Sequence, residues 1–182
     1  MAKALAIVGP SGSGKTELIC RLLEWFARRG LRVAVLKHTH HRDLGDRDKD
    51  TWRFRRAGAR VVALAAPGLL QVSRQVPGEP PLSEILAALS READLILVEG
   101  YKSGPLPKIA VLPASAKENP APSPQVIAMV GPAPVAAELP VFPPEELEAI
   151  GVFILTHLGL PGPAGDSGSG QGKAATRRHG KN

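Results

Sequence analysis

The chain has 182 residues, enough for one well-packed domain, and its 43% hydrophobic and 22% charged residues exclude wholesale disorder. Its single cysteine, Cys20, excludes an intrachain disulfide and a cysteine-only metal cage, and fits a reducing compartment. The formal net charge is +6, but the excess follows neither a helical stripe nor an aromatic pattern, so we do not expect a nucleic-acid partner.

No apolar segment approaches the 18 or so residues that a membrane span needs, and we expect no membrane partner. The short apolar run that ends at Val8 leads directly into a glycine-rich loop, so it is not interpreted as a signal peptide. These features together predict a cytoplasmic protein.

The N-terminal third predicts a strand, a helix and a second strand. Residues 5–8 are a short apolar strand, and residues 15–29 place their apolar side chains on one helical face. Gly30 suits the left-handed position that closes a helix, and residues 32–36 form the next strand. This order predicts two parallel strands joined by a right-handed crossover.

The middle of the chain alternates loops, helices and strands. A charged loop over residues 37–50 leads into a short helix at 50–57, which Gly58 ends. Strands are predicted at residues 60–65 and 69–74, separated by a turn at Pro67 and Gly68. Pro80 and Pro81 open a helix that runs to residue 90. The unbroken apolar run at 94–98 is typical of a strand that is covered on both faces.

The last third adds two strands and a helix. The strands are expected at residues 108–112 and 125–130, with a proline-rich surface loop between them. The helix begins at Pro143 and Pro144, and its expected buried stripe is Leu147, Ile150, Phe153, Ile154 and Leu158. We therefore expect an α/β fold, a three-layer P-loop NTPase domain over residues 1–160 with a mainly parallel sheet and room for an antiparallel strand at 69–74. Residues 161–182, rich in Gly, Ser, Pro and basic residues, are expected to be a disordered tail.

The strongest chemical signal is a phosphate-binding loop. Gly9, Gly14, Lys15 and Thr16 match the pattern G-x-x-x-x-G-K-[ST] between a strand and a helix. Glycines let backbone N–H groups approach an anion, the lysine reaches the outer phosphates, and the threonine hydroxyl can ligate Mg²⁺. The residues expected to hold the nucleotide here are Gly9, Ser11, Gly12, Ser13, Gly14, Lys15, Thr16 and Glu17.

A second carboxylate for the metal is expected at the end of another buried strand. Asp94 and Glu99 bracket one such strand, and ligands of parallel sheets gather beyond the carboxyl ends of the strands, which favours Glu99. Gly100 would let the backbone approach a terminal phosphate. Thr16 and Glu99 are thus the candidate metal ligands, with a water-mediated contact from Glu99, and Lys15 and Glu99 are the candidate catalytic residues.

A histidine-bearing loop follows the second strand and should emerge at the same sheet edge. His38, His40 and His41 could bind a transition metal, bind an anion together with Lys37, or simply form a solvated loop. The sequence leaves these alternatives open. Asp50 can cap the helix that follows.

Several motifs together resemble a known family. The phosphate loop is followed by Lys-His-Thr-His-His at 37–41, Asp-Thr-Trp-Arg-Phe-Arg-Arg-Ala-Gly-Ala at 50–59, Val-Glu-Gly-Tyr-Lys at 98–102 and Pro-Lys-Ile at 107–109. This series resembles the molybdopterin-guanine dinucleotide biosynthesis protein B family, MobB, over residues 4–158. The loop alone is unspecific, whereas the later motifs are specific in combination.

The resemblance implies a GTP-binding accessory protein of molybdenum cofactor biosynthesis that assists the attachment of GMP to molybdopterin. It implies a homodimer with weak Mg²⁺-dependent GTPase activity and a MobA-type guanylyltransferase as partner. Residues 12–16 would hold the phosphates and Glu99 would lie on the Mg²⁺ side. Near the site, the residues that match the family's motif positions are Lys37, His38, Asp50 and Lys102.

Two other functions use the same loop, a small-molecule kinase and a nickel or cobalt chaperone GTPase. The kinase needs an arginine-rich lid, but proline-rich loops follow Glu99, and the chaperone is favoured only by the histidines. No Asn-Lys-x-Asp guanine motif follows the strand at 125–130, where Gly-Pro-Ala-Pro stands instead. The choice of GTP over ATP therefore depends on the resemblance.

Overall fold

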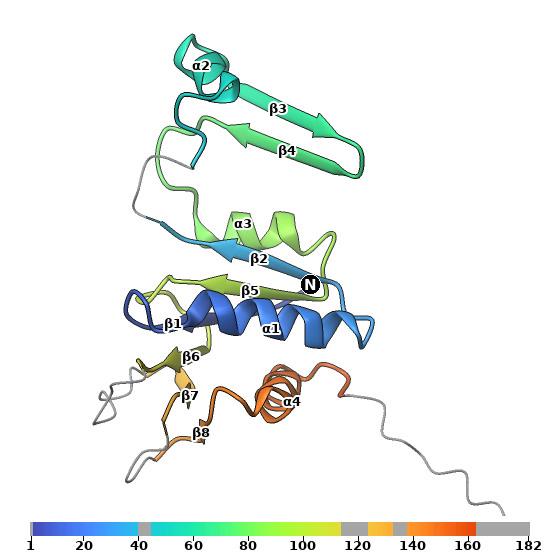
Figure 1. The fold of residues 1–182 in the computed structure, drawn as a ribbon, viewed down its shortest axis with the longest axis vertical. Coiled ribbons are helices and arrows are strands. Elements are labelled where there is room, and N and C mark those ends of the chain that lie inside the picture. The colour runs from blue at the N-terminus through green and yellow to red at the C-terminus, as the bar shows by residue number, and fades with distance from the viewer. Residues whose placement is uncertain (1, 40–44, 114–123, 133–137, 163–182) are drawn as a thin grey trace, which may run out of the picture.

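A parallel sheet of six strands, in the order β2-β5-β1-β6-β7-β8, is the centre of the fold (Figure 1). The computed structural model describes residues 2–39, 45–113, 124–132 and 138–162. The strands are β1 (Lys3–Val8), β2 (Val33–Lys37), β5 (Leu95–Glu99), β6 (Lys108–Val111), β7 (Val126–Val130) and β8 (Val141–Phe142). The predicted α/β class and mainly parallel sheet are confirmed.

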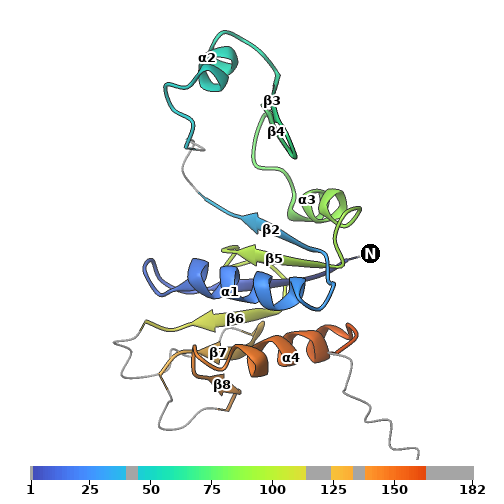
Figure 2. The same ribbon diagram turned by 45° about the vertical axis from the view of Figure 1, so that its right-hand side comes forward.

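Helices cover both faces of this sheet. Helices α1 (Lys15–Ala27) and α4 (Leu147–Leu158) lie on one face of the sheet (Figure 2). On this face Leu5 and Ile7 of β1 belong to the larger core. Helix α3 (Leu82–Leu89) packs on the other face against Ala6, Val8 and their neighbours. Successive residues of β1 alternate between the two cores, as the pleat of a strand requires. The layers are therefore helix, sheet and helix, as expected.

Helices α1 and α4 approach each other closely. A Cβ added to Gly151 in α4 would lie 2.6 Å from the indole ring of Trp25 in α1, so only glycine fits at this crossing. The buried residues of α4 are Ile150, Gly151, Ile154 and Leu155. The predicted stripe is thus correct at its centre, but Leu147, Phe153 and Leu158 lie at the margin of the core and Leu155 replaces them inside it.

A small unit projects beyond the β2 edge of the sheet in both views (Figures 1 and 2). It consists of α2 (Asp50–Arg56), β3 (Val61–Ala66) and β4 (Leu69–Arg74), which we call the arm. Strands β3 and β4 form their own two-stranded antiparallel sheet, joined by the turn at Pro67 and Gly68. The two strands were predicted at nearly these positions, but their separation from the main sheet was not.

Two further features differ from the sequence-based expectation. Strand β8 was not predicted, because two residues between prolines carry no periodic signal. The last helix begins at Leu147 rather than at Pro143, so Glu148 alone lies in its first turn. Within the described ranges no helix is both long and apolar enough to cross a membrane. The proline-rich residues 114–123 and the tail from residue 163 lie outside the described residues.

Candidate functional site

The loop between β1 and α1 adopts the backbone of an anion cradle. Gly12 and Gly14 have left-handed φ angles of 73° and 89°, which L side chains rarely adopt, and Gly14 is the residue before α1. The positive end of the helix dipole and its free backbone N–H groups face this loop. The local geometry is therefore that of a site for a negatively charged group.

Gly9 allows the loop to fold tightly against the sheet. A Cβ at this position would lie 2.4 Å from the carbonyl oxygen of Val111 and 2.7 Å from Oγ of Ser13. Neither atom can retreat, since one belongs to the backbone of β6 and the other to a buried side chain. The absence of a side chain at residue 9 is thus a steric requirement.

Two polar side chains of the loop, Lys15 and Thr16, make hydrogen bonds near the end of β1. Nζ of Lys15 lies over the loop and donates a hydrogen bond of 2.6 Å to the carbonyl oxygen of Pro10. Oγ1 of Thr16 donates to Oε2 of Glu99 at 3.1 Å, and Nζ of Lys37 pairs with Oε1 of Glu99 at 3.3 Å. A hydroxyl, a carboxylate and two ammonium groups therefore meet where β1, β2 and β5 end.

The alternative carboxylate, Asp94, lies at the opposite end of β5 and has another role. Its two oxygens accept bonds from the guanidinium of Arg32 at 2.7 and 3.2 Å. The backbone N–H of Arg32 also donates to Asp94 at 3.1 Å. These bonds hold the pKa of Asp94 below its ordinary value, and they tie the start of β5 to the start of β2. Asp94 is therefore remote from the loop.

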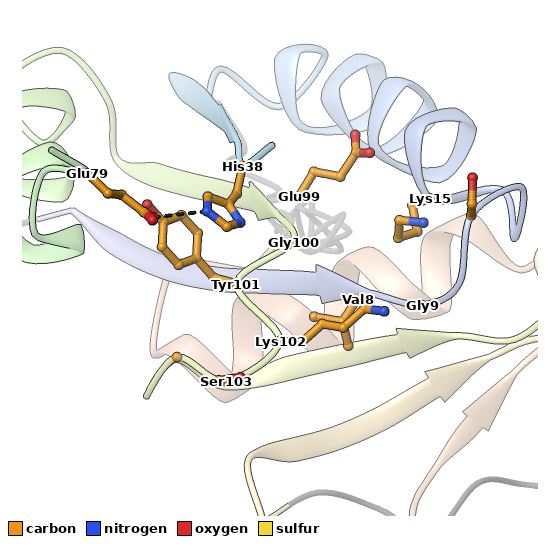
Figure 3. A pocket seen from close by; sticks show the side chains of 12 residues that line it. Val8, Gly9, Lys15, His38, Glu79, Glu99, Gly100, Tyr101, Lys102 and Ser103 are labelled. Atoms are coloured by element: carbon orange, nitrogen blue, oxygen red, sulfur yellow. Dashed lines mark ion pairs between the residues drawn. The ribbon is translucent and has the colours of Figure 1, made fainter. Parts of the chain in front are cut away.

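A hollow of about 520 Å³, the first hollow, opens between the loop and the carboxyl ends of β2 and β5 (Figure 3). Its volume lies within the usual range for small-molecule sites. It brings together half of the predicted site residues: Gly9, Ser11, Lys15, His38, Glu99, Gly100 and Lys102. Gly100 has a left-handed φ of 104°, and a Cβ there would approach Cβ of His38 at 3.2 Å.

The far wall of the first hollow is a cluster of three polar side chains. Nε2 of His38 lies 2.9 Å from Oε1 of Glu79, and the imidazole packs against the ring of Tyr101 with centroids 4.1 Å apart (Figure 3). Burial, and then the hydrogen bond with Glu79, raise the pKa of Tyr101 above its ordinary value. Tyr101 also takes a left-handed φ of 51°, an uncommon conformation for a non-glycine residue.

A buried lysine supports this wall from below. Lys108 is 1% exposed, and its Nζ donates to the carbonyl oxygens of Gly104 and Leu106 at 2.5 and 3.0 Å. Burial lowers its pKa from the ordinary value, because removal from water penalises the ammonium. The two carbonyl contacts fix the segment that carries Tyr101 and Lys102 past the hollow.

The remaining predicted residues lie elsewhere. Gly12, Ser13, Gly14 and Glu17 line a second hollow on the opposite flank of the loop. Asp50 lies in the arm, in a 3.7 Å ion pair with Arg53, and does not line the first hollow. His40 and His41 lie outside the described residues, and within those residues no three His, Cys, Asp or Glu side chains gather in a way that could hold a metal ion.

Sequence reasoning missed five lining residues of the first hollow, and two of them, Glu79 and Tyr101, form the cluster with His38; the other three are Val8, Ser103 and Gly104. Glu79 precedes Pro80 and Pro81 and carries no motif, so no sequence signal places it beside His38. Tyr101 had a signal, since it directly follows Glu99 and Gly100 at a strand end.

The donor set fits a nucleotide with a magnesium ion. Hydroxyl and carboxylate oxygens are the ligands that Mg²⁺ prefers, and Thr16 and Glu99 supply one of each. Two ammonium groups, Lys15 and Lys37, lie close by to balance phosphate charge. The Oγ of Ser13 is buried and has no hydrogen-bond partner among the described residues, so the loop itself holds an unsatisfied polar group.

Comparison with known proteins gives a consistent result. Residues 4–132 match the family model described as "Molybdopterin guanine dinucleotide synthesis protein B", or MobB. The chain is 30% identical over 162 residues to the molybdopterin-guanine dinucleotide biosynthesis adapter protein of Escherichia coli, covering 85% of this chain and 93% of that protein. It is 40% identical over 107 residues to the Haemophilus influenzae adapter protein, of whose length it matches 60%.

Solved structures of MobB proteins are also similar to this chain. A crystal structure of molybdopterin-guanine biosynthesis protein B superposes with a TM-score of 0.68 at 30% identity, covering 85% of this chain and 99% of that chain. The Bacillus subtilis MobB structure gives 0.66 at 26% identity, covering 86% and 98%.

Proposed function

Because this chain belongs to the MobB family, we propose that it is a GTP-binding adapter protein of molybdenum cofactor biosynthesis. In this role it assists a MobA-type guanylyltransferase in attaching GMP to molybdopterin. The observation that carries the proposal is the convergence of Lys15, Thr16, Lys37 and Glu99 on one phosphate loop. The E. coli and H. influenzae relatives are named for the same pathway.

The residues of the loop divide the work of binding. Backbone N–H groups of residues 12–16 and the ammonium of Lys15 would bind the phosphates, and Thr16 and Glu99, which contact each other, would hold Mg²⁺. A bound Mg²⁺ neutralises the charge that develops on the phosphates during transfer. Hydrolysis is slow, which suits a protein that presents a nucleotide to a partner rather than consuming it.

Replacement of Glu99 by glutamine tests the metal side of the site. We expect Mg²⁺-dependent GTP hydrolysis to fall by about 10- to 100-fold, because a carboxylate that orients metal ligands is usually worth this much. Phosphate release measured over a Mg²⁺ titration would show it. The matched control is Asp94→Asn at the other end of β5, which should leave hydrolysis unchanged. Equal rates for Glu99→Gln and the unaltered chain would contradict the assignment.

The arm supports the proposal of a homodimer. One face of its two-stranded sheet carries Val61, Ala63, Ala65, Leu70 and Val72, all exposed, with Arg74 at its edge. On the other face Leu64 and Leu69 are exposed too, but Val62 is buried and Ser73 accepts a hydrogen bond from Arg55 of α2. Two-stranded sheets are only marginally stable alone, and apolar faces of this kind are usually covered. A second copy of the chain, whose arm carries the same face, is the self-complementary occupant that two-fold symmetry requires.

Replacement of Val72 by lysine tests this interface. A charge at the centre of the apolar face should weaken the dimer by about 100-fold or more, because it would be buried unpaired. Sedimentation velocity over a concentration series measures the change. Gln71→Lys, on the opposite face of the same strand, is the control and should leave the dimer intact. An unaltered chain that sediments as a monomer at about 100 μM, well above the Kd of a stable pair, would refute the proposal.

A further inference from the structure

The proposed chemistry assigns no role to the second hollow, which lies on the other flank of the phosphate loop. Its volume is about 610 Å³. The loop residues Gly12, Ser13 and Gly14 form its floor, α1 contributes Leu18 and Arg21, and Leu112, Val130 and Gly131 follow from the ends of β6 and β7. The segment before α4 closes it with Pro143, Pro144 and Glu145. Its walls are thus mainly apolar, with a few charged groups at the rim.

The direction in which a phosphate chain would run along the loop decides which part of a nucleotide reaches this hollow. Thr16, Glu99 and Lys37 mark the end of the loop where the terminal phosphate and the metal would lie, and that end opens into the first hollow. The nucleoside must leave the loop on the other flank, because the phosphate chain runs along it. The second hollow begins at this flank and shares Gly12 and Gly14 with the cradle.

Two contacts define the walls of the second hollow. Ser13 is one of its floor residues, but its Oγ is buried against Gly9, 2.7 Å from where a Cβ of Gly9 would lie, so this atom is not exposed to the hollow. Arg21 donates from Nη1 to the carbonyl oxygen of Pro144 at 2.8 Å, which fastens the segment before α4 to α1. This bond positions the neighbouring Glu145 at the rim.

We propose that the second hollow binds the guanine base of GTP and that the carboxylate of Glu145 reads its Watson–Crick edge. This inference rests on the proposed nucleotide function and assigns it a base-selecting residue. Guanine presents two adjacent donors, N1–H and the 2-amino group, which a carboxylate accepts together. Adenine presents an acceptor at N1, and a carboxylate repels it. Glu145 thus supplies the selectivity that an Asn-Lys-x-Asp motif would otherwise provide.

The test is the substitution Glu145→Gln, which keeps the shape of the side chain and removes its charge. An amide offers one donor and one acceptor, so it can no longer accept from N1–H and the 2-amino group of guanine together, whereas it can pair with N1 and the 6-amino group of adenine. The ratio of GTP to ATP affinity, measured by titration calorimetry with Mg²⁺, should fall by about tenfold or more, the effect of losing one charge-assisted hydrogen bond. Inosine triphosphate lacks the 2-amino group, so it should bind the unaltered chain less tightly than GTP does. The Glu145→Gln variant should bind inosine triphosphate and GTP with about equal affinity.

The matched control is Glu146→Gln, one residue further along and outside the lining of the second hollow. It should leave both affinities unchanged. If GTP still requires Lys15 but Glu145→Gln leaves the GTP to ATP ratio as it was, the base pocket is wrong and the proposed function stands. If the unaltered chain binds neither nucleotide, the proposed function fails and the base pocket with it.

Discussion

Replacement of Lys15 by alanine is expected to weaken Mg²⁺–GTP binding by at least about 100-fold. The ammonium lies 2.6 Å from the carbonyl oxygen of Pro10, directly over the loop that would hold the phosphates. A charge-assisted hydrogen bond to phosphate is worth about 1.5–3 kcal/mol, and the lysine can make more than one. Titration calorimetry measures the loss.

The fold should survive this change, since the side chain of Lys15 lies at the surface of the loop, where its Nζ donates to the carbonyl oxygen of Pro10. The melting temperature without nucleotide should therefore match that of the unaltered chain. Lys3→Ala, at the opposite end of β1, is the control for the loss of one positive charge. Unchanged GTP affinity in Lys15→Ala would remove the basis of the proposed function.

Replacement of Gly9 by alanine is expected to damage both stability and binding. The new Cβ would lie 2.4 Å from the carbonyl oxygen of Val111 and 2.7 Å from Oγ of Ser13, so β1 and β6 must separate or the loop must move. Overpacking of this kind costs about 1–3 kcal/mol, and we expect the upper end of the range because one clash is with backbone. Thermal unfolding and GTP titration together measure it.

Gly30→Ala is the matched comparison for Gly9→Ala. Gly30 has a left-handed φ of 74°, but a Cβ there meets nothing within 4 Å. Gly30→Ala should therefore lower the free energy of unfolding only by the backbone strain of the left-handed conformation, about 1 kcal/mol, with no loss of GTP affinity. Equal destabilisation by the two substitutions would show that the close approach at Gly9 does not constrain the loop.

Local sequence patterns predicted most of the elements because each has its own periodic signal. The unbroken run at 94–98 identified the buried strand β5, and the helical spacing from Leu18 to Phe26 identified α1. The separate sheet of β3 and β4 was not predictable in this way, because alternation along a strand does not reveal which other strand it pairs with. Strand β8 is too short for any pattern.

The sequence predicted those residues of the candidate site whose position follows from the end of a strand. Glu99 ends β5 and His38 follows β2, and these two strands are neighbours in the sheet, so the meeting of the two residues at one edge follows from topology. Glu79 comes from a connection without regular structure, and its pairing with His38 depends on the path of the chain through the arm. Asp50 matched a family motif, but that motif lies in the arm rather than at the first hollow.

The pair of His38 and Glu79 joins the two ends of the arm, since His38 directly follows β2 and Glu79 lies shortly before α3. Without the arm, β2, α3 and β5 would form an ordinary crossover between adjacent parallel strands. The arm is therefore an insertion between β2 and α3, and the contact between His38 and Glu79 closes the loop that it forms. Because the entropic cost of closing a loop grows slowly with its length, a longer arm would cost little additional free energy. Such an arrangement would let the arm change in length while the six-stranded sheet keeps its register.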